Sequence, residues 1–226
     1  MIDITLVRID PADRACEAFF ACLPPPEQQR ANGIRRSDDR CRHVIARGAM
    51  RMLLGRKLGI APGAVALTTA GRGKPVLDPV IHARDARQVH FNVTHAGEWA
   101  GLALAGYPVG IDIEQIRALD VAALAAQVFD PATCRRMAGQ ADPRAFFFKC
   151  WTASEARWKA QGVGLAGAEV PWSAAHADPA ARVQPFDVAP GYYGAVCALG
   201  GPSADPPARM EITTWRAVDL FDALND

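Results

Sequence analysis

Hydrophobic and polar positions alternate in several short stretches of this 226-residue chain, and apolar residues recur at helical spacing in longer ones. Alternation indicates strands with two different faces, whereas apolar positions three or four residues apart indicate helices. The alternating stretches predict strands over residues 2–9, 89–93, 99–105, 109–114, 194–199 and 211–217. Helical spacing, bounded by Pro and Gly, predicts helices that begin near residues 27 and 130 and others over 38–58, 121–128 and 144–161.

A short internal repeat indicates two related halves. Glu98–Leu104 and Tyr192–Leu199 both carry an aromatic residue, then small residues and an alternating apolar tail, and each follows a long predicted helix. Self-similarity of this kind is typical of duplicated units. We therefore predict two related α/β halves that meet near Gly106–Pro108, rather than one continuous sheet.

Composition sets broad limits on the class of protein. Half of the residues are hydrophobic, so a chain of this length can bury a sizeable core as one large domain or two small ones. The formal net charge is only +1, and the six cysteines form no CxxC pair, which argues against a zinc site. No apolar run is long enough for a signal peptide or a transmembrane helix, so we expect a cytoplasmic protein with reduced thiols.

Positive charge is concentrated between Arg30 and Lys57, where nine basic residues stand against two acidic ones. This local excess predicts an anionic partner for the N-terminal half. One interpretation is a nucleic-acid-binding domain, which would bind tightly, with steep salt dependence and no need for magnesium.

Two acidic residues share one face of the predicted strand at 109–114. Alternate side chains of a strand point the same way, so Asp112 and Glu114 lie on the face opposite the apolar residues. Two carboxylates this close repel each other unless a cation lies between them. Mg²⁺ suits such a position, because it prefers oxygen ligands and retains places for water and phosphate. Spacing alone nevertheless favours a simpler interpretation, a half-exposed strand with a polar outer face.

Glu155 precedes Lys159 by one turn of the long predicted helix. At this spacing the ordinary interpretation is a surface ion pair, which contributes about 0.2–0.5 kcal/mol. The flanking Trp151 and Trp158, and Gly162 at the helix end, support a second interpretation. In it the carboxylate serves a metal ion and the lysine serves a phosphate.

Two further segments carry groups suited to phosphate. The turn at 71–75 places Arg72 and Lys74 among glycines whose N–H groups a phosphate can approach, although a plain surface turn is an equal alternative. This turn does not match a Walker A loop. Thr94 and His95 stand at the end of a predicted strand and can donate to a phosphate oxygen, but a lone histidine is more often a turn or core residue. The chain has no G-x-S-x-G elbow.

Four segments, taken in order, resemble one enzyme family, the 4'-phosphopantetheinyl transferases of the two-lobed surfactin-synthetase-activating type. They are GRGKP (71–75), FNVTHAGEWAGLAL (91–104), VGIDIE (109–114) and FFFKCWTASEARWK (146–159). The family signature is G-[IV]-D-[IV]-E followed by W-[ST]-x-K-E-x-x-x-K, and the spacing here fits. The resemblance covers most of residues 30–165.

The resemblance implies an α+β fold of two similar α/β lobes related by pseudo-two-fold symmetry. We expect an N-terminal lobe over residues 1–106 on the nucleotide and 3'-phosphate side, and a C-terminal lobe over 107–226 with the metal and the catalytic helix. The active site would lie in the cleft between the lobes, and the two-lobed form implies a monomer.

The implied activity is that of a holo-[acyl-carrier-protein] synthase. Such an enzyme moves the 4'-phosphopantetheine arm of coenzyme A to a serine of an apo acyl-, polyketide- or peptidyl-carrier protein and releases adenosine 3',5'-bisphosphate. The resemblance implies Mg²⁺ as the metal, with Mn²⁺ as an alternative. The expected partners are therefore coenzyme A and a carrier protein, and neither nucleic acid nor a membrane.

Matching positions to the family pattern implies residue roles. The metal ligands would be Asp112, Glu114 and Glu155, with Glu155 also the candidate general base and Lys159 the second catalytic residue. Lys159 and His95 would contact the pyrophosphate, Lys74 the nucleotide, and the basic helix the 3'-phosphate. The full set of expected coenzyme A contacts is Arg30, Arg42, His43, Arg72, Lys74, Thr94, His95 and Lys159.

One position departs from the family pattern. Ser154 stands where the pattern has a lysine directly before the helix glutamate. This change affects how the serine proton is handled and removes no metal ligand, and it leaves open an inactive relative that binds coenzyme A or a carrier protein without turnover. We expect Ser154→Lys to leave coenzyme A binding within a few-fold.

Overall fold

The computed structural model describes residues 1–10, 14–164, 181–200 and 209–225. Its strands are β1 Ile2–Arg8, β2 Leu67–Ala70, β3 Lys74–Leu77, β4 His90–Ala96, β5 Trp99–Ala105, β6 Val109–Gln115, β7 Ala181–Phe186, β8 Tyr192–Leu199 and β9 Met210–Arg216. Its helices are α1 Ala15–Ala21, α2 Pro25–Asn32, α3 Ser37–Leu58, α4 Val121–Val128, α5 Pro131–Ala138, α6 Pro143–Gln161 and α7 Ala217–Asn225. Short 3-10 helices cover Pro62–Ala64 and Asp85–Arg87.

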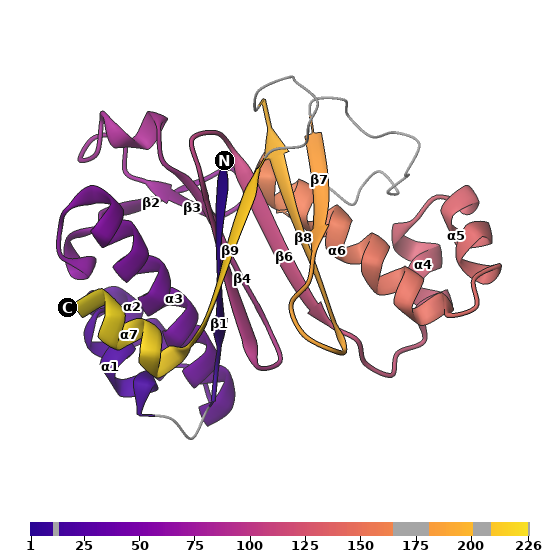
Figure 1. Cartoon of the computed structure of the whole chain (residues 1–226), viewed down its shortest axis with the longest axis horizontal. Coiled ribbons are helices and arrows are strands. Elements are labelled where there is room, and N and C mark those ends of the chain that lie inside the picture. Colours follow the sequence, from indigo (N-terminus) through magenta and orange to yellow (C-terminus); the bar gives the residue numbers. More distant parts are fainter. Residues whose placement is uncertain (11–13, 165–180, 201–208, 226) are drawn as a thin grey trace.

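The first sheet has the strand order β4-β5-β1-β9. Strand β1 pairs antiparallel with β5 and parallel with β9. Helices α1, α3 and α7 lie on one side of this sheet (Figure 1), and their apolar side chains form a core around Phe19, Ile45 and Leu220. The β2–β3 hairpin packs separately against α3 and β4.

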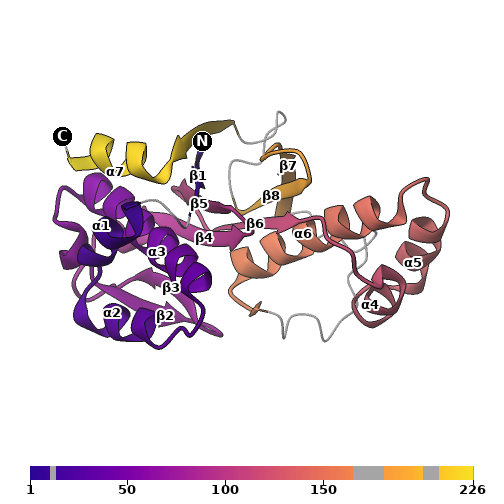
Figure 2. The same cartoon turned by 90° about the horizontal axis from the view of Figure 1, so that it is seen from below.

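The second sheet has the order β6-β8-β7, and helix α6 crosses one of its faces (Figure 2). The crossing is close because Gly110 of β6 has no side chain. A Cβ built there would lie 2.1 Å from the carbonyl oxygen of Ala156, far inside van der Waals contact. Helices α4 and α5 cover the first turns of α6 around Phe147 and Phe148.

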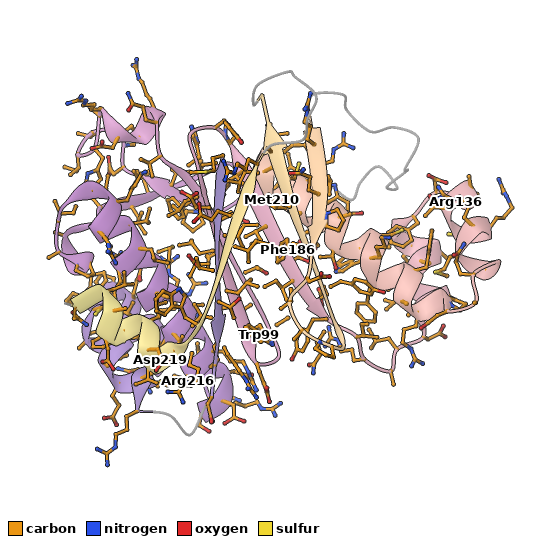
Figure 3. The ribbon with its side chains drawn as sticks, in the orientation of Figure 1. Trp99, Arg136, Phe186, Met210, Arg216 and Asp219 are labelled. Atoms are coloured by element: carbon orange, nitrogen blue, oxygen red, sulfur yellow. The ribbon has the colours of Figure 1, made fainter. Side chains whose placement is uncertain are left out.

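A shared core joins the two sheets. The apolar faces of β1, β5, β6 and β8 meet there, and Ile4, Ile111 and Val196 are at most 1% exposed. Figure 3 labels Trp99, Phe186 and Met210 of this layer among the strands, with Trp99 at the same end of the first sheet as the exposed ion pair of Arg216 and Asp219. The lobes are therefore packed against each other rather than linked loosely.

The expected α+β class is confirmed, and the two segments of the internal repeat are β5 and β8, which both lie in the interior of their sheets. A long helix, α3 or α6, packs beside each sheet. The C-terminal segment differs from expectation. The sequence assigns residues 210–225 to the second lobe, whereas β9 pairs with β1 and α7 packs on α3.

The sequence pattern also failed to predict five helices or strands: α1, β2, β3, β7 and α7. The turn expected at 71–75 is shorter, because Lys74 and Pro75 already belong to β3. None of the helices in the described ranges is long and apolar enough to cross a membrane.

Candidate functional site

Strand β6 presents its acidic face to helix α6 rather than to solvent. Val109, Ile111 and Ile113 enter the shared core, as the alternation predicts. Asp112 faces the other way and is nevertheless only 4% exposed, because Lys159 of α6 and Thr94 of β4 contact it. The interpretation that spacing alone favours, a half-exposed strand with a polar outer face, is therefore wrong for Asp112.

Asp112, Lys159 and Thr94 meet where the two lobes join. Lys159 Nζ lies 2.5 Å from Asp112 Oδ1, and Thr94 Oγ1 donates to the same oxygen at 3.1 Å. Lys159 Nζ is also 3.3 Å from Thr94 Oγ1. Burial raises the pKa of Asp112, and the Lys159 ammonium opposes that rise. The other oxygen, Oδ2, is buried without a hydrogen-bond partner among the described residues.

Two more carboxylates lie near this pair. Burial, then the charge of Asp112, raises the pKa of Glu114, whose Oε1 accepts a hydrogen bond from Trp151 Nε1 at 3.1 Å. Burial also raises the pKa of Glu155 to about 7, with the charges of Asp112 and Glu114 adding to the rise and Lys159 opposing it. Three acidic groups thus share the influence of one lysine.

These carboxylates do not form a closed metal site as they lie. No three His, Cys, Asp or Glu side chains within the described ranges converge closely enough to hold an ion. The donor set still suits a hard cation, because all the candidate atoms are carboxylate oxygens and Asp112 Oδ2 has no partner. An ion bound there would require at least one of the three carboxylates to move closer to the others, so the ligand roles stay predictions.

Lys74 and Arg72 join the 71–73 turn to the end of α6. Lys74 Nζ donates to the carbonyl oxygens of Val109 at 2.8 Å and Ala160 at 3.3 Å, and burial lowers its pKa to about 8. The Arg72 backbone N–H donates to Gly162 O at 3.2 Å, while the residue itself is exposed. In this structure the Lys74 ammonium thus binds backbone carbonyls, and its contact with a nucleotide stays a prediction.

The structure brings Arg30 and His43 together in one cavity of about 580 Å³. Arg47, Thr68 and Thr69 also line it. Burial lowers the pKa of His43, and the positive charges of Arg47, His95 and Arg30 lower it further. Glu27 also lines the cavity and binds Arg47, so the pocket beside the β2–β3 hairpin has a mixed lining with more basic than acidic side chains.

Arg42 does not line this pocket. It lines a second cavity of about 500 Å³ together with His95 and Glu114. Its guanidinium is held by Asp39 at 2.9 Å and by Gly97 O at 2.7 Å. Loss of hydration in the cavity lowers the pKa of His95, and Lys159 and Arg42 add to this. Arg42 and His43, expected together at the 3'-phosphate, thus face different cavities.

Sequence reasoning missed Arg47, Asn92 and Trp151 as residues of the site. Asn92 Oδ1 accepts from the Ile111 N–H at 2.9 Å and so joins β4 to β6 beside Asp112. Arg47 stands one helical turn after His43, a spacing that places both on one face of α3 and could have found it. No spacing signal predicts the contact of Asn92, because the approach of β4 to β6 is tertiary.

Comparisons with known proteins agree with this geometry. The family model for the 4'-phosphopantetheinyl transferase N-terminal region matches residues 8–106, and the model for the 4'-phosphopantetheinyl transferase superfamily matches residues 108–188. The 4'-phosphopantetheinyl transferase HetI of Nostoc sp. is 32% identical over 169 residues, which are 72% of this chain and 69% of HetI.

Two further relatives cover most of the chain. The 4'-phosphopantetheinyl transferase psf-1 of Bacillus pumilus is 29% identical over 203 residues, or 83% of this chain and 82% of psf-1. The 4'-phosphopantetheinyl transferase Sfp of Bacillus subtilis is 23% identical over 196 residues, or 80% of this chain and 84% of Sfp. The chain therefore belongs to the 4'-phosphopantetheinyl transferase family, as an enzyme of the Sfp type that transfers phosphopantetheine to carrier proteins.

Proposed function

We propose that the chain transfers the 4'-phosphopantetheine arm of coenzyme A to a serine of an apo acyl-, polyketide- or peptidyl-carrier protein, in a magnesium-dependent reaction that releases adenosine 3',5'-bisphosphate. The observation that carries the proposal is the buried cluster of Asp112, Lys159 and Thr94 at the junction of the lobes. Two further carboxylates lie near it, and one of them, Glu114, lines a cavity together with His95 and Arg42, whose basic side chains suit a pyrophosphate.

In the proposed reaction the carrier serine oxygen attacks the β-phosphorus of the coenzyme A pyrophosphate, and the bond to the bridging oxygen breaks. The leaving phosphate stays on adenosine 3',5'-bisphosphate. Lys159, Thr94 and His95 would bind the pyrophosphate and stabilise the charge that develops on it. Magnesium, held by Asp112, Glu114 and Glu155, would supply further neutralisation of that charge.

The serine proton needs an acceptor, and Glu155 is the candidate. When no metal ion is bound, burial raises its pKa to about 7, so the carboxylate can accept a proton near neutral pH, and Mg²⁺ on the same carboxylate would lower that pKa and make it a weaker base. Lys159 lies one turn away on the same face of α6. This ammonium opposes the rise in the Glu155 pKa, so a phosphate that drew Lys159 away would make Glu155 the stronger base.

The nucleic-acid alternative is less well supported. Much of the charge excess in the 30–57 segment is used inside the protein, since Glu27 binds both Arg47 and Arg51, and Asp39 binds Arg42. Arg51 is only 4% exposed and cannot contact a nucleic acid backbone. We also propose that the enzyme is cytoplasmic. We propose further that it acts as a monomer, because one chain supplies every residue of the candidate site.

The test is to mix the protein with coenzyme A, Mg²⁺ and an apo carrier protein and to look for the added arm by mass spectrometry. We expect modification by the wild type and by Asp222→Ala, a change at an exposed position on α7. EDTA and Asp112→Ala should abolish it. No modification of any carrier protein would disprove the activity, and modification that survives both treatments would disprove the metal site.

A further inference from the structure

We propose that Trp151 is a positioning residue for the metal site, whose indole N–H holds the Glu114 carboxylate in the orientation that receives the cation. This inference rests on the proposed function, in which Glu114 is a metal ligand. Trp151 itself cannot be a ligand, because an indole N–H is a donor only. Its effect on a metal would therefore pass entirely through Glu114.

The contact connects the two elements that carry the predicted ligands. Trp151 Nε1 of α6 donates to Glu114 Oε1 of β6 at 3.1 Å. Trp151 lies one helical turn before Glu155, so the two side chains share a face of α6. The hydrogen bond thus fixes a strand carboxylate relative to the helix that supplies the other predicted ligand.

Neighbouring rings hold the donor in place. The Trp151 ring stacks on Phe147, with centroids 6.3 Å apart and planes within 6°. Trp158 meets it edge-on, with centroids 5.9 Å apart and planes at 81°. Rings packed in these two arrangements have little freedom to turn, so the N–H points in one direction.

The neutral donor suits a carboxylate that must bind a cation. Asp112 already has a charged partner in Lys159, which offsets its negative charge. Glu114 receives instead a hydrogen bond from an uncharged group, which orients the carboxylate and leaves its negative charge available. Partners that orient metal ligands in this way commonly change metal affinity by 10–100-fold when they are removed.

The experiment compares Trp151→Phe with Trp158→Phe. Trp151→Phe keeps an aromatic ring and removes the N–H, whereas Trp158→Phe makes the same change in the neighbouring ring and keeps an aromatic ring at the position that packs against Trp151. Free Mn²⁺ is measured by electron paramagnetic resonance in a titration of each folded variant. We expect the apparent Kd for Mn²⁺ to rise roughly tenfold or more in Trp151→Phe and to stay within about twofold in Trp158→Phe.

A second readout separates positioning from general damage. In the transfer assay, Trp151→Phe should need about tenfold more Mg²⁺ for half-maximal rate while kcat at saturating Mg²⁺ stays close to that of the wild type. A folded Trp151→Phe that binds Mn²⁺ as the wild type does would overturn the inference. An equal loss in Trp158→Phe would overturn it too, because the effect would then come from ring packing.

Two arms keep the test decisive. If Trp151→Phe fails to fold, Trp151→Tyr replaces it, since its hydroxyl stands at a different point of the ring and the same loss of Mn²⁺ affinity is expected. A wild type that binds no Mn²⁺ would overturn the proposed metal site together with this inference. Mn²⁺ binding that is equal in the wild type and the variants would overturn this inference alone.

Discussion

Gly110 sets how closely helix α6 approaches strand β6, and Gly110→Ala tests that distance. A Cβ at this position would lie 2.1 Å from Ala156 O and 2.3 Å from Ala160 N. Both are backbone atoms, so no side chain can rotate to make room, and the helix must move away from the strand. Overpacking of this kind costs about 1–3 kcal/mol and occasionally more, and a clash with backbone belongs at the upper end.

The expected loss is therefore about 3 kcal/mol of unfolding free energy. For a chain of this size each kcal/mol lowers Tm by about 2–4 °C, so a thermal melt should show a fall of about 6–12 °C. Movement of α6 also separates Lys159 from Asp112, and misplacement by about 1 Å can lower activity about 100-fold. We therefore expect at least a tenfold lower transfer rate at 20 °C, a temperature at which the variant is still folded.

Gly106→Ala is the matched control, because a Cβ there would meet no atom closer than Gln88 O at 3.8 Å. We expect its Tm and transfer rate to match those of the wild type. If Gly110→Ala melted within 2 °C of Gly106→Ala and kept its activity, the close approach of α6 would not control the site, and the reasoning would be refuted.

Three further changes test other contacts. Asn92→Ala removes the acceptor of the Ile111 N–H between the lobes, so a urea titration should show a loss of about 1–3 kcal/mol, and a loss below about 0.5 would count against the contact. Glu27→Ala leaves the buried Arg51 without its carboxylate, and the denaturation midpoint should fall by the equivalent of about 3–5 kcal/mol. Burial lowers the pKa of His43, so the folded protein favours the neutral imidazole. The contribution of His43 to the free energy of unfolding is therefore complete above about pH 6.5 and falls as the pH drops below that value. In melts between pH 7.5 and 5.5, His43→Gln should flatten that fall, and an unchanged slope would contradict the burial of His43.

The segments with a regular hydrophobic pattern could be predicted from the sequence. Strand β6 alternates aliphatic residues with other residues, β5 and β8 are short apolar runs, and α3 and α6 are long helices that end at the left-handed glycines Gly59 and Gly162. The missed elements lack those signals. Strand β7 contains Pro185 and lies at the edge of its sheet, where a missing N–H is tolerated. Helix α1 is short and has no side-chain cap.

Pairing between distant segments could not be predicted. Strand β9 was expected as a strand, but nothing in its alternation indicates that it lies parallel to β1 at the other end of the chain. The same limit applies to the site. Asp112 was identified by spacing and resemblance, whereas its burial depends on α6 and β4, which approach it only in the folded molecule.

Ser154, which stands where the family pattern has a lysine, lies inside the protein rather than at the charged site. Its side chain is fully buried, and its hydroxyl donates to Cys150 O at 2.7 Å within α6. A lysine at this backbone position would begin inside the protein and would need a path to solvent or a buried anion. The cation that meets Asp112 comes instead from Lys159, one turn beyond Glu155. The serine therefore changes the packing of α6 rather than the charge beside Asp112, and this favours an active enzyme over an inactive relative.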